Sequence, residues 1–320
     1  MHIALVTCDA AALAPDVAAF MVRTDLPLVT ALEDRGAEVS RPVWRDTAVD
    51  WGQFDLALVR TTWDYTERRA EFVEWAARTA VLTRLWNPPD VLRWNTHKSY
   101  VLELEDRGAP IVPTAWLGHG DRIDLGELLT ARGWSRAVVK PAVASGSRGM
   151  VRVSLELRPS SDGEPTGRGS VDQAPPAGAD EFDLPSGQRH LDELLAVGDA
   201  LVQPYLPAVT RRGELSVVVV DGEVSHAVRK VPPNGEFRVQ ETYGGRYQAE
   251  SIDRDVATLA RWVVDATGTD LLIARVDLLE DETGAHQVVE VEATEPDLYL
   301  AAHPGAAGQV ADAILRRARG

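Results

Sequence analysis

Two carboxylates stand two residues apart in a run that has the composition of a β-strand. Glu290 and Glu292 alternate with valines in residues 286–292, and side chains two residues apart in a strand point to the same face. A second strand-like run, residues 271–279, carries Asp277 among apolar residues. Acids inside strands are costly unless they are paired or bind a cation. The three acids therefore predict a site for a hard metal ion, such as magnesium carrying a phosphate. Solvated carboxylates on an exposed edge strand are the alternative.

The first hundred residues alternate between strand and helix patterns. We expect strands at 3–7, 37–43 and 54–60, and helices at 25–35 and 67–80. This rhythm predicts a parallel sheet with helices on both faces. In such sheets, ligands bind at the carboxyl ends of the strands.

The loop after the third expected strand is therefore a candidate ligand-facing segment. It offers a cation, two hydroxyls, an aromatic ring and an acid, and the candidate substrate contacts are Arg60, Thr61, Thr62, Trp63 and Asp64. A capped helix start with Trp63 packed inward is the alternative interpretation.

The rest of the chain reads as short elements separated by turns. The expected elements are a helix at 95–106, an extended connector at 109–114, strands at 137–141, 150–155 and 200–206, a hairpin of 214–221 and 223–230, and a helix at 254–267. Residues 158–187 are rich in Pro, Gly, Ser and acids, which predicts a flexible insertion without chemistry. We divide the chain into an N-terminal α/β domain (1–108), a central lid domain (109–202) and a C-terminal domain (203–320).

Composition excludes several classes of partner. The 320 residues carry a formal net charge of -16, which argues against nucleic acid or an anionic membrane as the main partner. The single cysteine, Cys8, cannot form an internal disulfide and fits a reducing compartment. The apolar start of the chain reads as a strand and not as a signal peptide, and no apolar stretch approaches the ~18 residues of a membrane span. We expect a cytoplasmic protein.

A lysine stands before a loop of small residues near the middle of the chain. Lys140 ends an apolar strand, and residues 145–149 read Ser-Gly-Ser-Arg-Gly. Glycines let backbone N–H groups approach phosphate oxygens, and the ammonium adds a point charge. The order matches neither a Walker loop nor a dinucleotide-binding turn. Taken alone, the loop is better explained as a plain hairpin turn.

Further motifs follow one another in a recognisable order. They are Lys98, Lys140 with the glycine loop, the strand-to-linker segment 203–206, Gly213-Glu214, Arg229-Lys230, Arg275-Val276-Asp277 and Glu290-Val291-Glu292. Over nearly the whole chain this order resembles the ATP-grasp superfamily, in particular the glutathione-synthetase-like branch. The phrases at 60–65 and 290–299 look most like those of the cyclo-ligases of cycloserine biosynthesis.

The resemblance implies a mixed α/β (α+β) ATP-grasp fold, with an N-terminal parallel-sheet domain followed by a two-part module with a mobile lid. It implies ATP and two Mg²⁺ ions as cofactors. The implied nucleotide contacts are Lys98, Lys140, Ser145, Gly146, Ser147, Arg148, Gly149, Gln203, Tyr205, Leu206 and Glu214. The implied metal ligands are Asp277, Glu290 and Glu292. The implied catalytic cations are Lys230, Arg229, Arg275 and Arg246, and Arg238 is a further candidate for the substrate.

The implied reaction is the ATP-dependent activation of a carboxyl group as an acyl phosphate, which a nitrogen nucleophile then attacks. The substrate would be a small, amino-acid-like molecule, and both ring closure and intermolecular ligation are open. A phosphotransferase and a non-catalytic nucleotide-binding protein are the alternatives. The oligomeric state is open, and homodimers are common in the branch that the chain resembles. In one respect the chain departs from the family pattern, because many relatives carry Asn where Glu292 stands.

Overall fold

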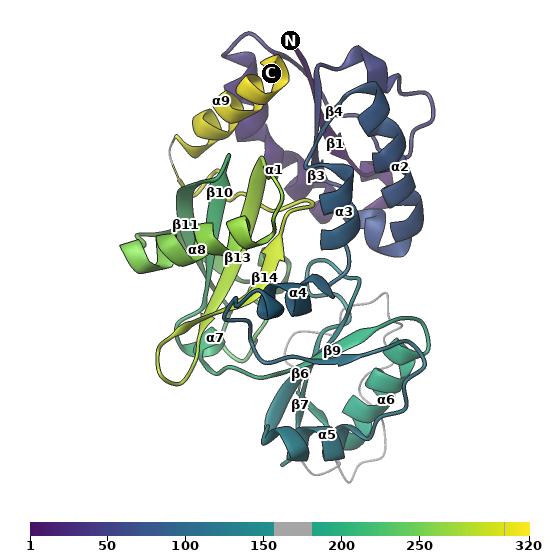
Figure 1. The fold of residues 1–320 in the computed structure, drawn as a ribbon, viewed down its shortest axis with the longest axis vertical. Coiled ribbons are helices and arrows are strands. Elements are labelled where there is room, and N and C mark those ends of the chain that lie inside the picture. Colours follow the sequence, from purple (N-terminus) through teal and green to yellow (C-terminus); the bar gives the residue numbers. More distant parts are fainter. Residues whose placement is uncertain (157–180, 304) are drawn as a thin grey trace.

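The computed structural model describes residues 1–156, 181–303 and 305–320. The described strands form three sheets, one for each third of the chain (Figure 1). The two chain ends lie close together at one end of the molecule (Figure 1). None of the described helices is both long and apolar enough to cross a membrane.

The N-terminal sheet is parallel, as the sequence pattern predicted. It contains β1 (His2–Thr7), β2 (Glu38–Ser40), β3 (Leu56–Thr61) and β4 (Arg84–Trp86), in the order β2-β1-β3-β4. The expected strand at 37–43 is shorter than predicted. The predicted third strand is confirmed, and its last residues lead into the short 3₁₀ helix η3 (Trp63–Glu67).

Helices cover this sheet. They are α1 (Pro15–Glu33), α2 (Arg69–Leu82) and α9 (Ala306–Arg319), and α9 lies beside α1 (Figure 1). Helix α1 begins well before the predicted residue 25, because Pro15 occupies its first position, where a fixed φ suits a helix. Phe72, Trp75 and Ala76 of α2 are buried, as predicted. Short 3₁₀ helices, η1 (Ala10–Ala12) and η2 (Trp51–Gln53), complete this part.

The single helix predicted at 95–106 is wrong at its start. The structure has α3 (Pro89–Asn95) and α4 (Tyr100–Asp106), separated by a turn that carries Lys98. The side chain of Asn95 hydrogen-bonds to the backbone of residues 291 and 293. A local sequence pattern cannot predict these hydrogen bonds of Asn95 to a distant strand.

The central sheet has the order β5-β9-β6-β7-β8. Its strands are β5 (Ala115–Leu117), β6 (Arg136–Pro141), β7 (Val151–Ser154), β8 (Glu181–Asp183) and β9 (Ala200–Pro204), and α5 (Leu125–Arg132) and α6 (Leu184–Leu195) pack on it. The flexible insertion predicted at 158–187 is therefore wrong for its last residues. Asp183 caps α6 by accepting a hydrogen bond from the Ser186 N–H, which fixes the start of the helix. Residues 157–180 lie outside the described residues.

The C-terminal sheet has the order β12-β11-β10-β13-β14. It contains β10 (Glu214–Val220), β11 (Glu223–Val231), β12 (Arg246–Glu250), β13 (Ile273–Glu280) and β14 (His286–Glu292), all antiparallel. Helix α8 (Arg254–Ala266) crosses this sheet (Figure 1), and α7 (Ala208–Arg211) and η4 (Glu241–Tyr243) are short connecting turns. The predicted hairpin, the helix at 254–267 and both acidic strands are confirmed.

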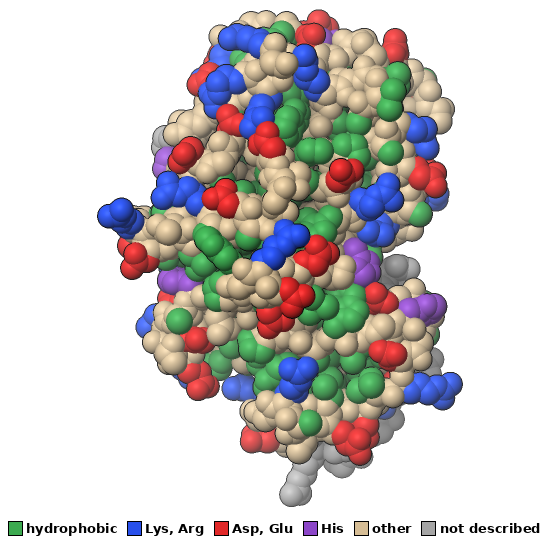
Figure 2. All heavy atoms as spheres, in the orientation of Figure 1, with side chains coloured by type: hydrophobic (Ala, Val, Ile, Leu, Met, Phe, Trp, Pro, Cys, Tyr) green, Lys and Arg blue, Asp and Glu red, His purple; other side chains and the backbone are tan. Residues whose placement is uncertain are grey.

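Apolar cores extend across the predicted domain limits. One core joins Ile3 and Leu56 of the N-terminal sheet to Val218 and Ile314, and another joins Tyr100 to Val276 and Val291. The division at residues 108 and 202 stays a prediction. On the surface, basic and acidic side chains are mixed over the face shown in Figure 2.

Candidate active site

A cavity of about 720 Å³ is lined by residues from all three parts of the chain. The N-terminal part supplies the start of α1 and the residues after β3, the central part supplies the end of β6 and the glycine loop, and the C-terminal part supplies β10, β11, β13 and β14. Charged and aromatic side chains therefore meet across sequence distances of more than two hundred residues.

Three carboxylates converge in this cavity. One oxygen atom from each of Asp277, Glu290 and Glu292 lies within 4.8 Å of the others. The strand register explains this, because Asp277 lies opposite Glu290 in the β13–β14 pair and Glu292 follows two residues later on the same face. A donor set made only of carboxylate oxygens fits a hard cation such as Mg²⁺.

Cations surround the most deeply buried of these acids. Arg275 Nη2 lies 2.8 Å and Lys230 Nζ 3.5 Å from the Asp277 carboxylate, and the Ser216 hydroxyl also donates to it. Burial acts to raise the pKa of Asp277, but Arg275 and Lys230 outweigh it and hold that pKa well below its ordinary value. Asp277 is therefore a carboxylate at neutral pH.

Glu292 and the nearby Glu295 have raised pKa values, in contrast to Asp277. Burial raises the pKa of Glu292 to about 7, with Glu290 and Asp277 adding to the effect and Arg275 opposing it. Burial raises the pKa of Glu295 to about 8, with Glu292 adding to it. Without a cation, the cluster therefore holds protons that a bound cation would displace.

Two lysines face the acids from other elements. Lys98 Nζ donates to Glu290 Oε1 at 2.6 Å and to the carbonyl oxygen of Ala144 at 3.2 Å. Lys140 lines the cavity and forms no ion pair with any described residue. Burial lowers the pKa of Lys140, and Glu290 opposes this. A lysine that lines a cavity and forms no ion pair with a described residue is suited to bind an anionic ligand.

The structure brings most of the predicted nucleotide contacts to one cavity. Those that line it are Lys98, Lys140, Ser145, Gly146, Ser147, Arg148, Gln203, Tyr205, Leu206 and Glu214. Gly149 does not line it, although its φ of +69° keeps the loop in a conformation that favours glycine. Arg148 Nη2 also donates to the carbonyl oxygen of Trp63 at 2.9 Å, so the glycine loop contacts the N-terminal part.

The predicted catalytic cations divide into two groups. Lys230 and Arg275 line the cavity, whereas Arg229 and Arg246 do not. Side chains alternate between the two faces of a strand. In β11, Lys230 therefore faces the acids while Arg229 pairs with Glu250 on β12 at 3.2 Å. Arg246 is exposed at the start of β12.

The predicted substrate contacts also divide. Trp63, Asp64 and Arg238 line the cavity, whereas Arg60, Thr61 and Thr62 are buried behind its wall. Arg238 Nη2 lies 2.7 Å from Glu236 Oε2, and its guanidinium carbon lies 3.8 Å from the centre of the Tyr243 ring. Asp64 accepts a hydrogen bond from the indole N–H of Trp44 at 2.7 Å.

Arg60 has a partner that the sequence analysis did not identify. Its Nε lies 3.1 Å from Asp25 Oδ1, and neither side chain is exposed to solvent. A second guanidinium nitrogen donates to the carbonyl oxygen of Pro296 at 2.8 Å, and Arg41 also pairs with Asp25 at 3.0 Å. The Arg60 side chain therefore ties α1 to the segment after β14 and does not reach the cavity.

We expect Asp25→Asn to lower the free energy of unfolding by about 3–5 kcal/mol, because it leaves the buried Arg60 without its anion. Chemical denaturation measures this loss. The matched control is Glu33→Gln on the exposed surface of the same helix, for which we expect a change within about 0.5 kcal/mol. A loss for Asp25→Asn below about 1 kcal/mol would contradict the importance of this pair.

Several cavity residues were not singled out from the sequence. They are Val17, Phe20, Tyr247, Glu295, Asp297 and Tyr299. Phe20 and Trp63 stack with their ring centres 5.8 Å apart and form one aromatic wall. Phe20 lies in a helix that was predicted to begin later, so no local signal placed it near the loop after β3. The phrase at 290–299 was recognised as a motif, and a polar and aromatic run directly after metal ligands was a usable signal for the last three.

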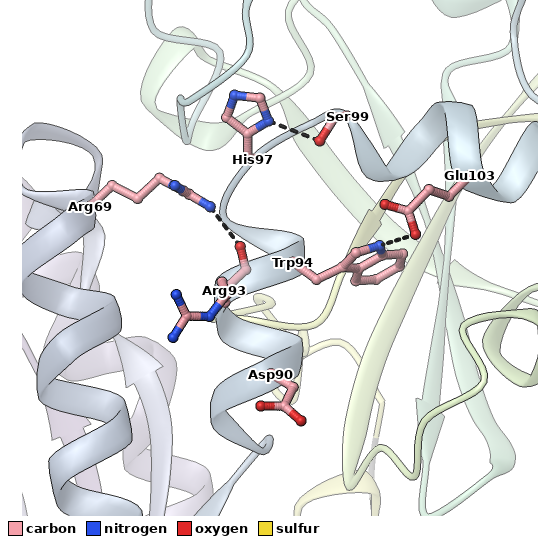
Figure 3. A pocket seen from close by; sticks show the side chains of 7 residues that line it. All are labelled: Arg69, Asp90, Arg93, Trp94, His97, Ser99 and Glu103. Carbon is pink, nitrogen blue, oxygen red and sulfur yellow. Dashed lines mark hydrogen bonds between the residues drawn. The ribbon is translucent and has the colours of Figure 1, made fainter.

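A second, smaller pocket lies outside this site. Its volume is about 380 Å³, and it is formed by α2, α3, α4 and the turn between α3 and α4 (Figure 3). Figure 3 shows Arg69 donating to the Arg93 carbonyl oxygen and Trp94 donating to Glu103, so its polar groups largely bind one another. None of the predicted site residues lines it.

Comparisons with known proteins agree with the geometry. Residues 3–87 match the family model of the N-terminal domain of D-cycloserine synthetase DcsG, and residues 188–304 match that of the RimK-like ATP-grasp domain. The cycloserine biosynthesis protein DcsG of Streptomyces lavendulae is 31% identical over 320 residues, which cover 96% of this chain and 98% of that protein. The chain belongs to the DcsG family of ATP-grasp ligases.

Solved structures support this membership of the DcsG family. The crystal structure of D-cycloserine synthetase DcsG has a TM-score of 0.80 and 28% identity, and the match covers 99% of this chain and all of that one. A D-alanine–D-alanine ligase from Bacillus anthracis in complex with ATP has a TM-score of 0.66 at 14% identity, over 100% and 97% of the two chains, and shows the shared fold. The predicted fold and enzyme class, an ATP-dependent ligase that forms C–N bonds, are confirmed. ATP and Mg²⁺ are the general requirements of ATP-grasp ligases.

Proposed function

We propose that this protein closes a ring within a small amino-acid derivative, with ATP as the activating co-substrate, in an antibiotic pathway of the cycloserine type. One observation carries the proposal. The cavity that holds the acidic cluster is also lined by the segment that matches the DcsG N-terminal domain, through residues that include Asp9, Phe20, Trp63 and Asp64. A substrate held by this segment would present its carboxyl group to the phosphate end of a bound nucleotide.

The nucleotide would lie between the central and C-terminal sheets. Apolar residues of the cavity on this side, including Val138, Leu206 and Leu279, are suited to a base. Lys98 and Lys140 would bind phosphate oxygens, and the backbone of the glycine loop would add N–H donors. Glu214, whose carboxylate pairs with Lys230, would be the acceptor for sugar hydroxyls.

Asp277, Glu290 and Glu292 would hold two Mg²⁺ ions. The ions would neutralise phosphate charge and orient the transferred group. The deeply buried Asp277 is already a carboxylate, whereas Glu292 would lose its proton when a cation binds. Glutamate in place of the more common asparagine would add one negative charge to this end of the site.

The reaction would proceed in two steps. A carboxylate oxygen of the substrate would first attack the γ-phosphorus, the bond to the bridging oxygen would break, and ADP and an acyl phosphate would result. A nitrogen of the same molecule would then attack the carbonyl carbon, the C–O bond to phosphate would break, and the nitrogen would lose a proton. Lys230 and Arg275 would stabilise the developing negative charge. The contact of Arg148 with Trp63 would help to exclude water from the acyl phosphate.

Product analysis distinguishes ring closure from its alternatives. With O-ureido-serine as the test substrate and no added amine, we expect ADP, phosphate and a cyclic product in equal amounts. ADP formation that requires an added amine would indicate intermolecular ligation instead, and a stable phosphorylated product would indicate a phosphotransferase. A screen of free amino acids in the same assay tests the substrate class.

We expect Trp63→Ala to raise the KM for the carboxylate substrate by about tenfold or more, because it removes an aromatic wall worth about 1–3 kcal/mol. The KM for ATP should change less than twofold. The matched control is Trp262→Ala on α8, where the indole is 40% exposed. Loss of ATP affinity alone in Trp63→Ala would place this loop at the nucleotide and contradict the proposal.

A further inference from the structure

The strand that carries two of the three clustered acids is an edge strand. β14 ends the order β12-β11-β10-β13-β14, so only β13 pairs with it as a strand. On its other side, residues 110–112 pair with it at Val288 alone, where Val112 N–H donates to the Val288 carbonyl oxygen at 3.0 Å and Val288 N–H donates to the Pro110 carbonyl oxygen at 2.7 Å. An open strand edge leaves N–H and C=O groups without partners and lets the strand move. The position of Glu290 and Glu292 therefore depends on what pairs with the free edge of β14.

Side chains and backbone from the preceding part of the chain complete that edge. Asn95 Nδ2 donates to the Val291 carbonyl oxygen at 2.7 Å, and Asn95 Oδ1 accepts from the Ala293 N–H at 2.7 Å. The Tyr100 hydroxyl accepts from the Val291 N–H at 3.1 Å. Both backbone groups of Val291 are thus bound by side chains from α3 and α4. We call Asn95 and Tyr100 the edge clamp.

The clamp acts at the residue between two clustered acids. Val291 separates Glu290 from Glu292, so fixing both of its peptide groups fixes the directions in which the two carboxylates leave the strand. Asn95 and Tyr100 are 8% and 1% exposed, so water competes little for these bonds. The same helix-to-helix turn carries Lys98, which binds Glu290.

We propose that Asn95 and Tyr100 are positioning residues that set the separation of the Glu290 and Glu292 carboxylates for cation binding. This inference rests on the proposed metal site and goes beyond it, because neither residue contacts a carboxylate of the cluster through any recorded bond. Groups that orient metal ligands typically change metal affinity by 10–100-fold when they are lost. A clamp with only a structural role would change stability and leave cation affinity unaltered.

The test is direct cation binding. Mn²⁺ serves as a paramagnetic probe in the presence of ADP, and its Kd is measured by electron paramagnetic resonance. We expect Asn95→Ala to raise this Kd by about tenfold or more and Tyr100→Phe to raise it severalfold. The control is Thr83→Val, which removes another buried hydrogen bond, from Thr83 Oγ1 to the Phe54 carbonyl oxygen, and this bond involves no residue of β14. It should leave the Kd within twofold.

The outcomes separate the clamp from the site itself. Wild-type Mn²⁺ affinity in folded Asn95→Ala and Tyr100→Phe overturns the clamp. If Asn95→Ala does not fold, Tyr100→Phe decides alone, since it removes one oxygen atom. Unchanged Mn²⁺ binding in Glu290→Gln would refute the metal site as well. If Glu290→Gln loses Mn²⁺ binding and Tyr100→Phe keeps the wild-type Kd, the clamp is refuted and the metal site is not.

Discussion

Glu290→Gln should lower kcat/KM by about a thousandfold or more, which corresponds to a loss of about 4 kcal/mol in transition-state stabilisation. The amide keeps the shape of the side chain and removes the charge that faces Asp277 and Glu292. Its pair with Lys98 is lost, but Glu290 is 28% exposed at the cavity, so the fold should survive. Steady-state ADP release measures the activity, and thermal unfolding checks the fold.

Asp277→Asn should lose activity to the same extent and should also lose stability. Asp277 is the buried anion for both Arg275 and Lys230. Removing its charge leaves two buried cations with less compensation, and breaking such a network typically costs about 3–5 kcal/mol. The two variants therefore share one effect on catalysis and differ in their effect on the fold.

The control for both acids is Glu282→Gln. Glu282 is exposed in the turn between β13 and β14, so its charge is far from the cluster along the same hairpin. We expect its activity to stay within twofold of the wild type. Activity near the wild type in Glu290→Gln would contradict the assignment of this acid to a metal.

Lys140→Met should lower kcat/KM for ATP by about a hundredfold to a thousandfold. Lys140 points into the cavity without an ion pair to any described residue, so a phosphate is the anion that it is suited to bind. Because Lys140 forms no ion pair with any described residue, its removal should cost little stability. Kinetics at varied ATP concentration and a denaturation curve measure the two effects.

A matched comparison for this variant is Lys98→Met. Lys98 already binds Glu290, so its loss also removes the partner of a clustered acid. Lys98→Met should therefore raise the concentrations of both Mg²⁺ and ATP that half-maximal activity requires. Lys140→Met should raise the ATP concentration that half-maximal activity requires and should change the required Mg²⁺ concentration less. The same Mg²⁺ response in both variants would contradict the separate roles of the two lysines.

Local patterns predicted what depends on neighbours in the chain. The strand at 286–292, the turn at Asp221-Gly222 and the parallel N-terminal sheet are confirmed, because side-chain alternation and turn chemistry act over a few residues. The same alternation separates Lys230 from Arg229. From the sequence alone, Arg229 and Lys230 are equivalent cations, because the local pattern does not show which face of the hairpin is buried.

The failures have a common physical cause. Arg60 lies near the end of β3 and was predicted to bind substrate, yet it is fully buried against Asp25. The helix predicted at 95–106 included Asn95 as an ordinary helix residue. In the structure, the Asn95 side chain hydrogen-bonds to a strand nearly two hundred residues away. In both cases a polar side chain satisfies a buried partner that is distant in sequence, and no local pattern records that partner.

The sequence by itself determined that Glu290 and Glu292 share one face of a strand, because the two-residue period of a strand is a local property. The order of its motifs also indicated the ATP-grasp superfamily, and the phrases at 60–65 and 290–299 resembled the group of cyclo-ligases that the comparison then showed. The sequence also predicted that Asp277 joins them, and the strand register of the structure brings it there. Only the tertiary structure decided that Lys98 binds Glu290, that Lys230 lies beside Asp277, and that Asn95 and Tyr100 bind their strand edge. Those contacts depend on how three sheets pack, because burial and strand register bring together charges that the chain keeps far apart.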